Sequence, residues 1–180
     1  TFSHLFFNMF ALWMFGKILE NVWGAKRFLI YYMVTALGAA VLHLGVSQYE
    51  ILSLQSQVNT TDLNILLENG KSILEGNQNY SNQIMGKLNL LINTPTVGAS
   101  GAVFGILLAF GMLFPNTLLY IYFAIPVKAK YFVMVYGALE LYLGISNNPA
   151  DNVAHFAHLG GMLFGFLLLK YWQKDRNTFY

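Results

Sequence analysis

The stretch Gly98–Phe114, GASGAVFGILLAFGMLF, decides the fold. It has no charged residue, and its one side-chain hydroxyl, that of Ser100, stands close to its N-terminal end. A helix that spans a membrane needs roughly 20 mostly apolar residues. Residues 97–114 come close to that length, so the sequence predicts a membrane segment here that carries a polar group near one end.

Four further stretches of the chain have the same character. They cover about 3–19, 28–47, 128–146 and 154–172. Only 10% of the 180 residues are charged, whereas a soluble domain carries about 25%. We therefore expect an all-α, polytopic membrane helix bundle with five visible transmembrane helices. The net charge of +2 gives no reason to expect a nucleic-acid partner, and the lack of Cys excludes thiolate metal sites.

Two polar or interrupted stretches lie between these segments. Residues 48–96 are rich in Asn and Gln, and we expect an extramembrane insertion or a partly disordered segment that interrupts one membrane domain over 1–180. Within this stretch, apolar residues around 65–74 hint at a short amphipathic helix. The second stretch is apolar but lies between Pro115 and Pro126, so it is too short to span. It predicts a cytoplasmic connector at the membrane interface.

The basic residues predict the orientation of the segments. If the segments alternate in direction, one side collects eight of them and the other side only Lys71 and Lys87. The larger group consists of Lys17, Lys26, Arg27, Lys128, Lys130, Lys170, Lys174 and Arg176. The positive-inside rule places this group in the cytoplasm. The chain begins at Thr1 without the pattern of a signal peptide, and we expect its start to be truncated.

Polar side chains inside a membrane are costly and usually have a role. In this orientation five of them share the outer part of the membrane, which predicts a single site: His4, Asn8, Ser100, His155 and His158. Glu140 is the ionisable residue of the fourth segment. We expect it to hydrogen-bond to a neighbouring helix, since buried ionisable groups need partners. A part in admitting substrate is the alternative for Glu140.

Ser100 and His158 are the candidates for nucleophile and base. Ser100 stands at a helix start, where unpaired N–H groups could stabilise an oxyanion, although a serine there can equally be an N-cap. His158 lies three residues before Gly161, on the same helix face. Two GxxxG patterns, Gly101 with Gly105 and Gly161 with Gly165, would let the two backbones approach closely. Without catalysis, His158 would be a hydrogen-bonded interhelical residue.

His4 and Asn8 are four residues apart and share one helix face. Both can donate hydrogen bonds to an oxyanion, or they can join neighbouring helices. A zinc site at His4, His155 and His158 is disfavoured, because no HExxH pattern occurs and no Asp or Glu stands beside them in sequence. We therefore predict neither a metal nor a cofactor.

Three blocks of sequence together resemble a known family. HLFFNMFALWMFG, GASGAVFG and AHFAHLGGMLFG occur in this order and look like the signature blocks of rhomboid intramembrane proteases. The resemblance implies a Ser–His dyad without an acidic member, formed here by Ser100 and His158 rather than His155. It also implies that His4 and Asn8 contribute to the oxyanion hole, and that Phe104 packs against the catalytic histidine.

The resemblance implies an intramembrane serine endopeptidase that cleaves transmembrane segments of proteins in the lipid bilayer. Gly98 and Gly101 would allow a tight backbone around the serine. The first of six core helices, and a loop with a Trp-Arg pair, have no counterpart here. The alternatives are an inactive rhomboid-like protein that escorts transmembrane clients, and a transporter or channel. We expect a bacterial plasma membrane, with the site open to the external side.

Overall fold

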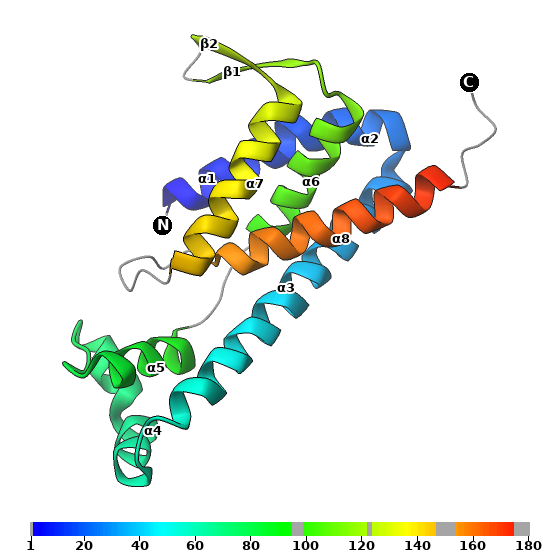
Figure 1. The fold of residues 1–180 in the computed structure, drawn as a ribbon. Coiled ribbons are helices and arrows are strands. Elements are labelled where there is room, and N and C mark those ends of the chain that lie inside the picture. The colour runs from blue at the N-terminus through cyan, green and yellow to red at the C-terminus, as the bar shows by residue number, and fades with distance from the viewer. Residues whose placement is uncertain (1, 95–98, 122–123, 147–153, 175–180) are drawn as a thin grey trace. The chain divides into compact units, whose positions relative to one another are not determined.

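The computed structural model describes residues 2–94, 99–121, 124–146 and 154–174. They belong to two compact units, one of Thr1–His43 with Gly98–Tyr180 and one of Leu44–Val97. Nearly all regular structure in the described residues is helical, which confirms the all-α class (Figure 1). Each of the five predicted membrane segments coincides with a helix or with a run of joined helices.

The first segment forms one continuous run of helix with a local irregularity. α1 (Phe2–Ala11) passes through a π-helical turn, η1 (Leu12–Gly16), into α2 (Lys17–Trp23). The run ends at Gly24, whose φ of 79° is a conformation that side-chain-bearing residues avoid. The second segment follows at once as α3 (Ala25–Gln55), which is longer than the predicted 28–47.

The first unit is built around α6 (Ser100–Leu113). Eleven of its 14 residues are buried, which is what an apolar helix without a polar face requires. α6 packs against α8 (His155–Lys174) and α7 (Ala129–Ser146), and these two also contact each other (Figure 1). The largest core cluster includes Phe15, Tyr31, Ile106, Phe110 and Leu169, and so joins η1, α3, α6 and α8.

The predicted connector after α6 has a structure that the sequence analysis did not foresee. β1 (Leu118–Ile121) pairs antiparallel with β2 (Ile125–Lys128), with Leu118 opposite Lys128. The pairing satisfies backbone groups of the two strands, as a segment too short to span as a helix still requires. Pro126 sits opposite Tyr120 in a two-stranded ribbon, where both strands are edges.

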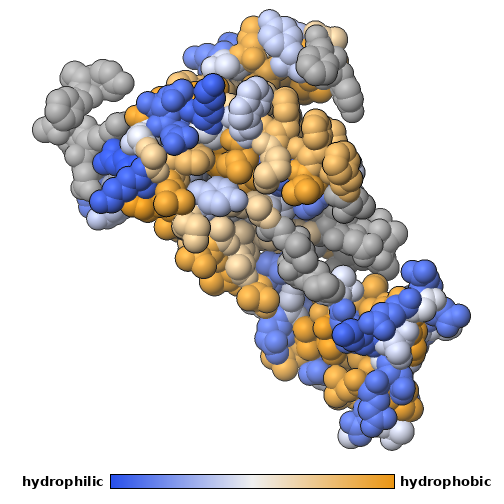
Figure 2. Space-filling view, turned by 180° about the vertical axis from the view of Figure 1, so that it is seen from behind, coloured by the Kyte–Doolittle hydropathy of each residue, from blue (hydrophilic) through white to orange (hydrophobic). Residues whose placement is uncertain are grey.

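The surface of the first unit is strongly apolar. Figure 2 shows hydrophobic residues over much of the face in view, with hydrophilic residues gathered in patches. Large apolar side chains such as Val41, Tyr142 and Phe166 are exposed, as expected where lipid and not water is the surrounding medium. By length and composition, the helices Phe2–Trp23 and Ala25–Gln55 are able to cross a membrane, and α6 is apolar but shorter.

The second unit overlaps the predicted insertion at 48–96. Besides the end of α3 it holds α4 (Thr60–Glu75) and α5 (Gln83–Asn93), which pack over Leu66, Met85 and Leu88. Asn59 and Asn82 cap the two helices through their side-chain oxygens. The amphipathic helix expected near 65–74 is thus present as α4.

Candidate active site

The structure brings Ser100 and His158 together. Ser100 is the first residue of α6 and His158 lies in the first turn of α8. His158 Nε2 lies 2.9 Å from Ser100 Oγ, although the residues are 58 positions apart in sequence. Both are buried, with exposed fractions of 8% and 6%. A serine hydroxyl and an imidazole at this distance have the geometry of a nucleophile and its base.

Phe104 fixes the plane of the His158 ring. The two rings stack nearly parallel, with an interplanar angle of 8° and a centroid separation of 3.9 Å. Phe104 follows Ser100 by four residues, so both side chains project from the same face of α6. Tyr136 of α7 in turn packs against Phe104, with ring centroids 5.0 Å apart. The imidazole is therefore held flat against α6, with one nitrogen facing the serine.

Glycines allow the helices to approach this closely. A Cβ at Gly161 would overlap the carbonyl oxygen of Gly101, so the backbones of α6 and α8 touch at this point. A Cβ at Gly105 would meet Thr35 of α3, and one at Gly165 would meet Tyr31 of the same helix. The second glycine of each GxxxG pattern therefore makes room for α3. Gly98 lies outside the described residues.

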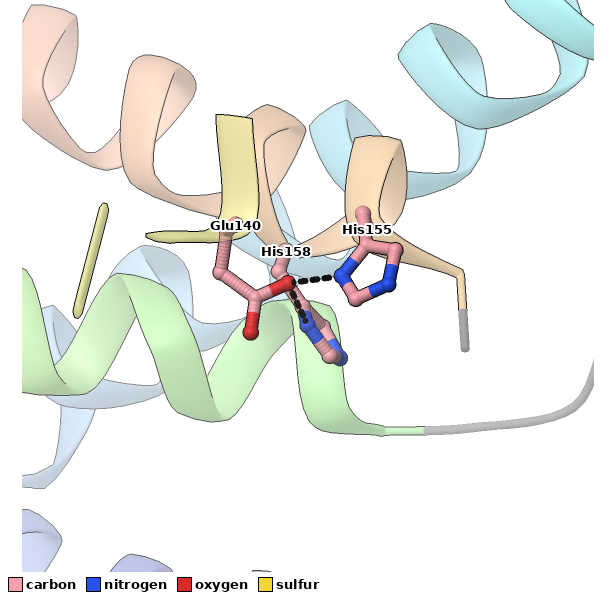
Figure 3. A group of neighbouring side chains, drawn as sticks. All are labelled: Glu140, His155 and His158. Carbon is pink, nitrogen blue, oxygen red and sulfur yellow. Dashed lines mark hydrogen bonds and ion pairs between the residues drawn. The ribbon is translucent and has the colours of Figure 1, made fainter. Parts of the chain in front are cut away.

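Glu140 is part of this cluster, which the sequence analysis did not predict. Its Oε2 lies 2.6 Å from His155 Nδ1 and 2.8 Å from His158 Nδ1. Figure 3 shows the carboxylate of α7 directed at both rings of α8. The expected hydrogen bond to a neighbouring helix exists, and it joins Glu140 to the site itself. The position of Glu140 along the fourth segment could have indicated that it lies near the site. It lies six residues before the outer end of that segment, roughly 9 Å at 1.5 Å per residue.

The charge of Glu140 determines which nitrogen of His158 carries the proton. If Glu140 is ionised, its carboxylate only accepts hydrogen bonds, so Nδ1 of each histidine donates to it. In a neutral His158 ring Nε2 is then unprotonated and can accept the hydrogen of the Ser100 hydroxyl. This is the tautomer that a general base needs when it removes a proton from serine.

The same side chains offer a possible set of metal ligands. One ligand atom each from Glu140, His155 and His158 lies within 4.8 Å of the others. Two histidines and a glutamate are a set that catalytic zinc uses. The argument that no carboxylate stands beside the histidines is therefore wrong in three dimensions, because the fold brings Glu140 to two of them. These residues fit a zinc ion by chemistry, and they also hydrogen-bond directly to one another.

The structure does not bring His4 and Asn8 into the cluster. His4 is exposed and Asn8 is half-buried, although α1 contacts α6. The Asn8 side-chain amide donates to the His4 carbonyl oxygen of its own helix at 2.7 Å. This bond uses one of the two N–H groups of the Asn8 amide, so a contribution to the oxyanion needs the second one to point toward Ser100. The predicted oxyanion role of both residues stays a prediction.

Comparison with known proteins identifies the family to which this site belongs. A family profile described as the Rhomboid domain matches residues 1–174 of the chain.

The chain belongs to the rhomboid family. It is 27% identical over 180 residues to rhomboid protein 1, mitochondrial, of Saccharomyces cerevisiae, covering 98% of this chain and 41% of that protein. It is 37% identical over 87 residues to an uncharacterised mitochondrial rhomboid protein of Schizosaccharomyces pombe, covering 45% of this chain and 22% of that protein. No solved structure matches the chain.

Membership of the rhomboid family makes this chain part of an integral membrane protein. The chain spans less than half the length of the curated relatives it matches. Both relatives are mitochondrial by name, so they do not support the bacterial plasma membrane expected from the sequence. Within this rhomboid chain, the described site differs from a bare Ser–His dyad, because a buried carboxylate contacts the histidine.

Proposed function

We propose that this rhomboid chain carries the site of an intramembrane serine endopeptidase, with Ser100 as nucleophile and His158 as general base. The proposal rests above all on the 2.9 Å separation of Ser100 Oγ and His158 Nε2 in a buried position. Family membership supports the same chemistry, and the proposed substrates are transmembrane segments of other proteins. The site faces the side of the membrane opposite the short basic loops.

The proposed reaction is acyl transfer in two steps. His158 Nε2 takes the proton of the Ser100 hydroxyl while Ser100 Oγ bonds to the carbonyl carbon of the peptide. The tetrahedral intermediate then expels the amine, which receives the proton from His158 as the C–N bond breaks. A water molecule attacks the acyl-serine ester, again with His158 as base, and Ser100 is released with the new carboxylate.

The oxyanion of each tetrahedral intermediate needs donors that point to it. Ser100 begins α6, and the first N–H groups of a helix have no partner within the helix. We assign the oxyanion to the Ser100 N–H together with the Asn8 amide and the ring of His4. α1, which carries Asn8 and His4, contacts α6, which carries Ser100. Such donors act in a water-poor site, where they contribute most.

An inactive rhomboid-like protein that binds transmembrane clients is the alternative. In such a protein the bond between Ser100 and His158 would serve only to join α6 and α8. The hydrogen-bonded pair, together with the ring of Phe104 stacked on the base, favours the enzyme. A transporter would need ionisable groups along a pathway, whereas the buried carboxylate and imidazole groups of the described residues, Glu140, His155 and His158, meet at one point.

Cleavage of a transmembrane reporter tests the proposal. The full-length protein, reconstituted in liposomes, is compared with Ser100→Ala and with the matched control Ser72→Ala. Ser72 is exposed and its hydroxyl donates to the Asn69 carbonyl oxygen in α4. We expect Ser100→Ala to reduce cleavage to background and Ser72→Ala to leave it unchanged. Cleavage by a folded Ser100→Ala protein at the parent rate would overturn the proposed function.

A further inference from the structure

A charged side chain is buried in a helix whose other residues mostly face outward. In α7 only Ala129, Val133 and Glu140 are buried. An ionisable group inside a membrane is costly unless its hydrogen-bonding capacity is satisfied. Glu140 meets this requirement through two histidines of α8 that share its Oε2. Glu140 is the one buried carboxylate among the described residues, and it contacts the imidazole that lies next to Ser100.

Three contacts restrain His158 on three sides. Phe104 covers one face of the ring, Glu140 accepts from Nδ1, and Ser100 lies at Nε2. The ring can neither flip nor exchange its tautomer without losing at least one of these contacts. When His158 takes the proton of serine it becomes an imidazolium, and the carboxylate 2.8 Å away stabilises that charge.

His155 supports the carboxylate and not the serine. It lies three residues before His158, so both side chains leave the same face of α8. The two rings are nearly perpendicular, at 89°, with centroids 6.4 Å apart, and their Nδ1 atoms meet at the same oxygen of Glu140. His155 thus occupies a second lone pair of Oε2 and keeps the carboxylate directed at His158.

We propose that Glu140 is a positioning residue of this site, which holds His158 in the tautomer with Nε2 unprotonated and stabilises its charged form. The proposal rests on the proposed function, since it presumes that Ser100 and His158 react. It turns the implied dyad into a Ser–His–Glu arrangement, with the carboxylate supplied by α7. His155 acts one step further out, as the residue that positions Glu140.

Glu140→Gln tests this role while keeping the shape of the side chain. The amide oxygen can still accept from the two Nδ1–H groups, but the amide has no charge to stabilise the imidazolium, and its NH₂ group cannot accept at all. We expect kcat to fall by about 10²–10⁴-fold, in line with the loss of the acidic member in other serine proteases, while KM changes less than about threefold. A purely structural Glu140 would change the amount of folded protein and leave kcat per folded molecule at the parent value. That result would overturn the proposal.

Two readouts separate this proposal from the proposed function. Suppose that Ser100→Ala is inactive while Glu140→Gln keeps the parent kcat and the parent rate of labelling by a fluorophosphonate. The positioning role of Glu140 is then wrong, whereas Ser100 remains the nucleophile. Glu68→Gln, an exposed carboxylate of α4, is the matched control and should change neither. Activity that is lost on dialysis against a chelator and restored by zinc would overturn the proposal, because the three side chains would then hold a metal.

A spectroscopic measurement on the unaltered protein covers the case in which Glu140→Gln does not fold. Histidine labelled with ¹⁵N reports which ring nitrogen carries the proton. We expect His158 to be protonated at Nδ1 in the resting enzyme, with that proton in a strong hydrogen bond to the carboxylate. A His158 ring protonated at Nε2 in the resting enzyme would overturn the proposal, since it could not accept the proton of Ser100.

Discussion

α1 and the α6–α8 pair were both expected to supply polar groups to one site. In the structure the polar groups of α6 and α8 bond to each other, whereas the Asn8 amide of α1 bonds within its own helix. At the start of α6 and α8, Ser100 and His158 are buried and bond to each other across the helix interface. On α1, His4 is exposed, and the Asn8 amide bonds to its own helix. The difference follows from packing, because glycines bring the backbones of α6 and α8 into contact, whereas α1 has no buried residue.

The largest effect should come from the base. We expect His158→Ala to lower kcat by about 10⁴–10⁶-fold, as for the base of other serine proteases. His155→Ala is the matched control on the same face of α8, and it should cost far less, because the bond between Glu140 and His158 remains. Reporter cleavage in liposomes gives both values. The reverse order would mean that His155 is the base.

The next largest effect tests whether Asn8 of α1 takes part in the reaction, although its amide bonds to its own helix in the structure. If the Asn8 amide turns to the oxyanion, Asn8→Ala should lower kcat by about 10²–10³-fold. Asn69→Ala is a matched control, since its amide makes the same bond to a carbonyl four residues earlier, at 3.2 Å. The two variants are compared by cleavage rate. Equal rates would limit Asn8 to its bond within α1 and end its oxyanion role.

A single methyl group should separate the site helices. Gly161→Ala places a Cβ against the Gly101 carbonyl, so α8 has to move away from α6. A shift of about 1 Å between reacting groups can cost about 10²-fold in rate, and we expect a loss of that order. At Gly45 of α3 a Cβ meets nothing within 4 Å, so Gly45→Ala should be harmless. Equal cleavage rates of the two variants would contradict the role of close packing.

The smallest effect is expected in the second unit. Glu50 and Lys87 form an ion pair at 3.5 Å whose side chains are partly exposed. Such pairs contribute about 0–1 kcal/mol, so Glu50→Gln should lower thermal stability slightly and leave cleavage unchanged. Thermal unfolding and the reporter assay together check this. A strong loss of cleavage would tie the Leu44–Val97 unit to the reaction.

The sequence predicted best what depends on local pattern. The five apolar segments became helices because runs of apolar residues in a membrane must satisfy their backbone bonds internally. The β1–β2 hairpin was not predicted, since prolines indicate only that a helix is interrupted. The capped helices α4 and α5 carried visible signals in Asn59 and Asn82, which precede them as N-caps.

Within the site, the sequence pointed to Ser100 and His158 but not to the part of Glu140. Spacing within one helix places His155 and His158 on one face. The contact of Glu140 with both depends on how α7 packs against α8, which no spacing within a segment encodes. The position of Glu140 in the outer half of the fourth segment was the available signal, which the sequence analysis did not use. For Asn8, spacing identified a helix face and could not say that the amide bonds to its own backbone.

Labelling with a fluorophosphonate tests the central claim most directly, because it needs no knowledge of the natural substrate. The reagent reacts with a serine only when a base activates it. Peptide mapping of the labelled full-length protein should place the modification on Ser100, and His158→Ala should abolish it. Absence of labelling in the folded parent, or labelling at another serine that persists in His158→Ala, would contradict the account.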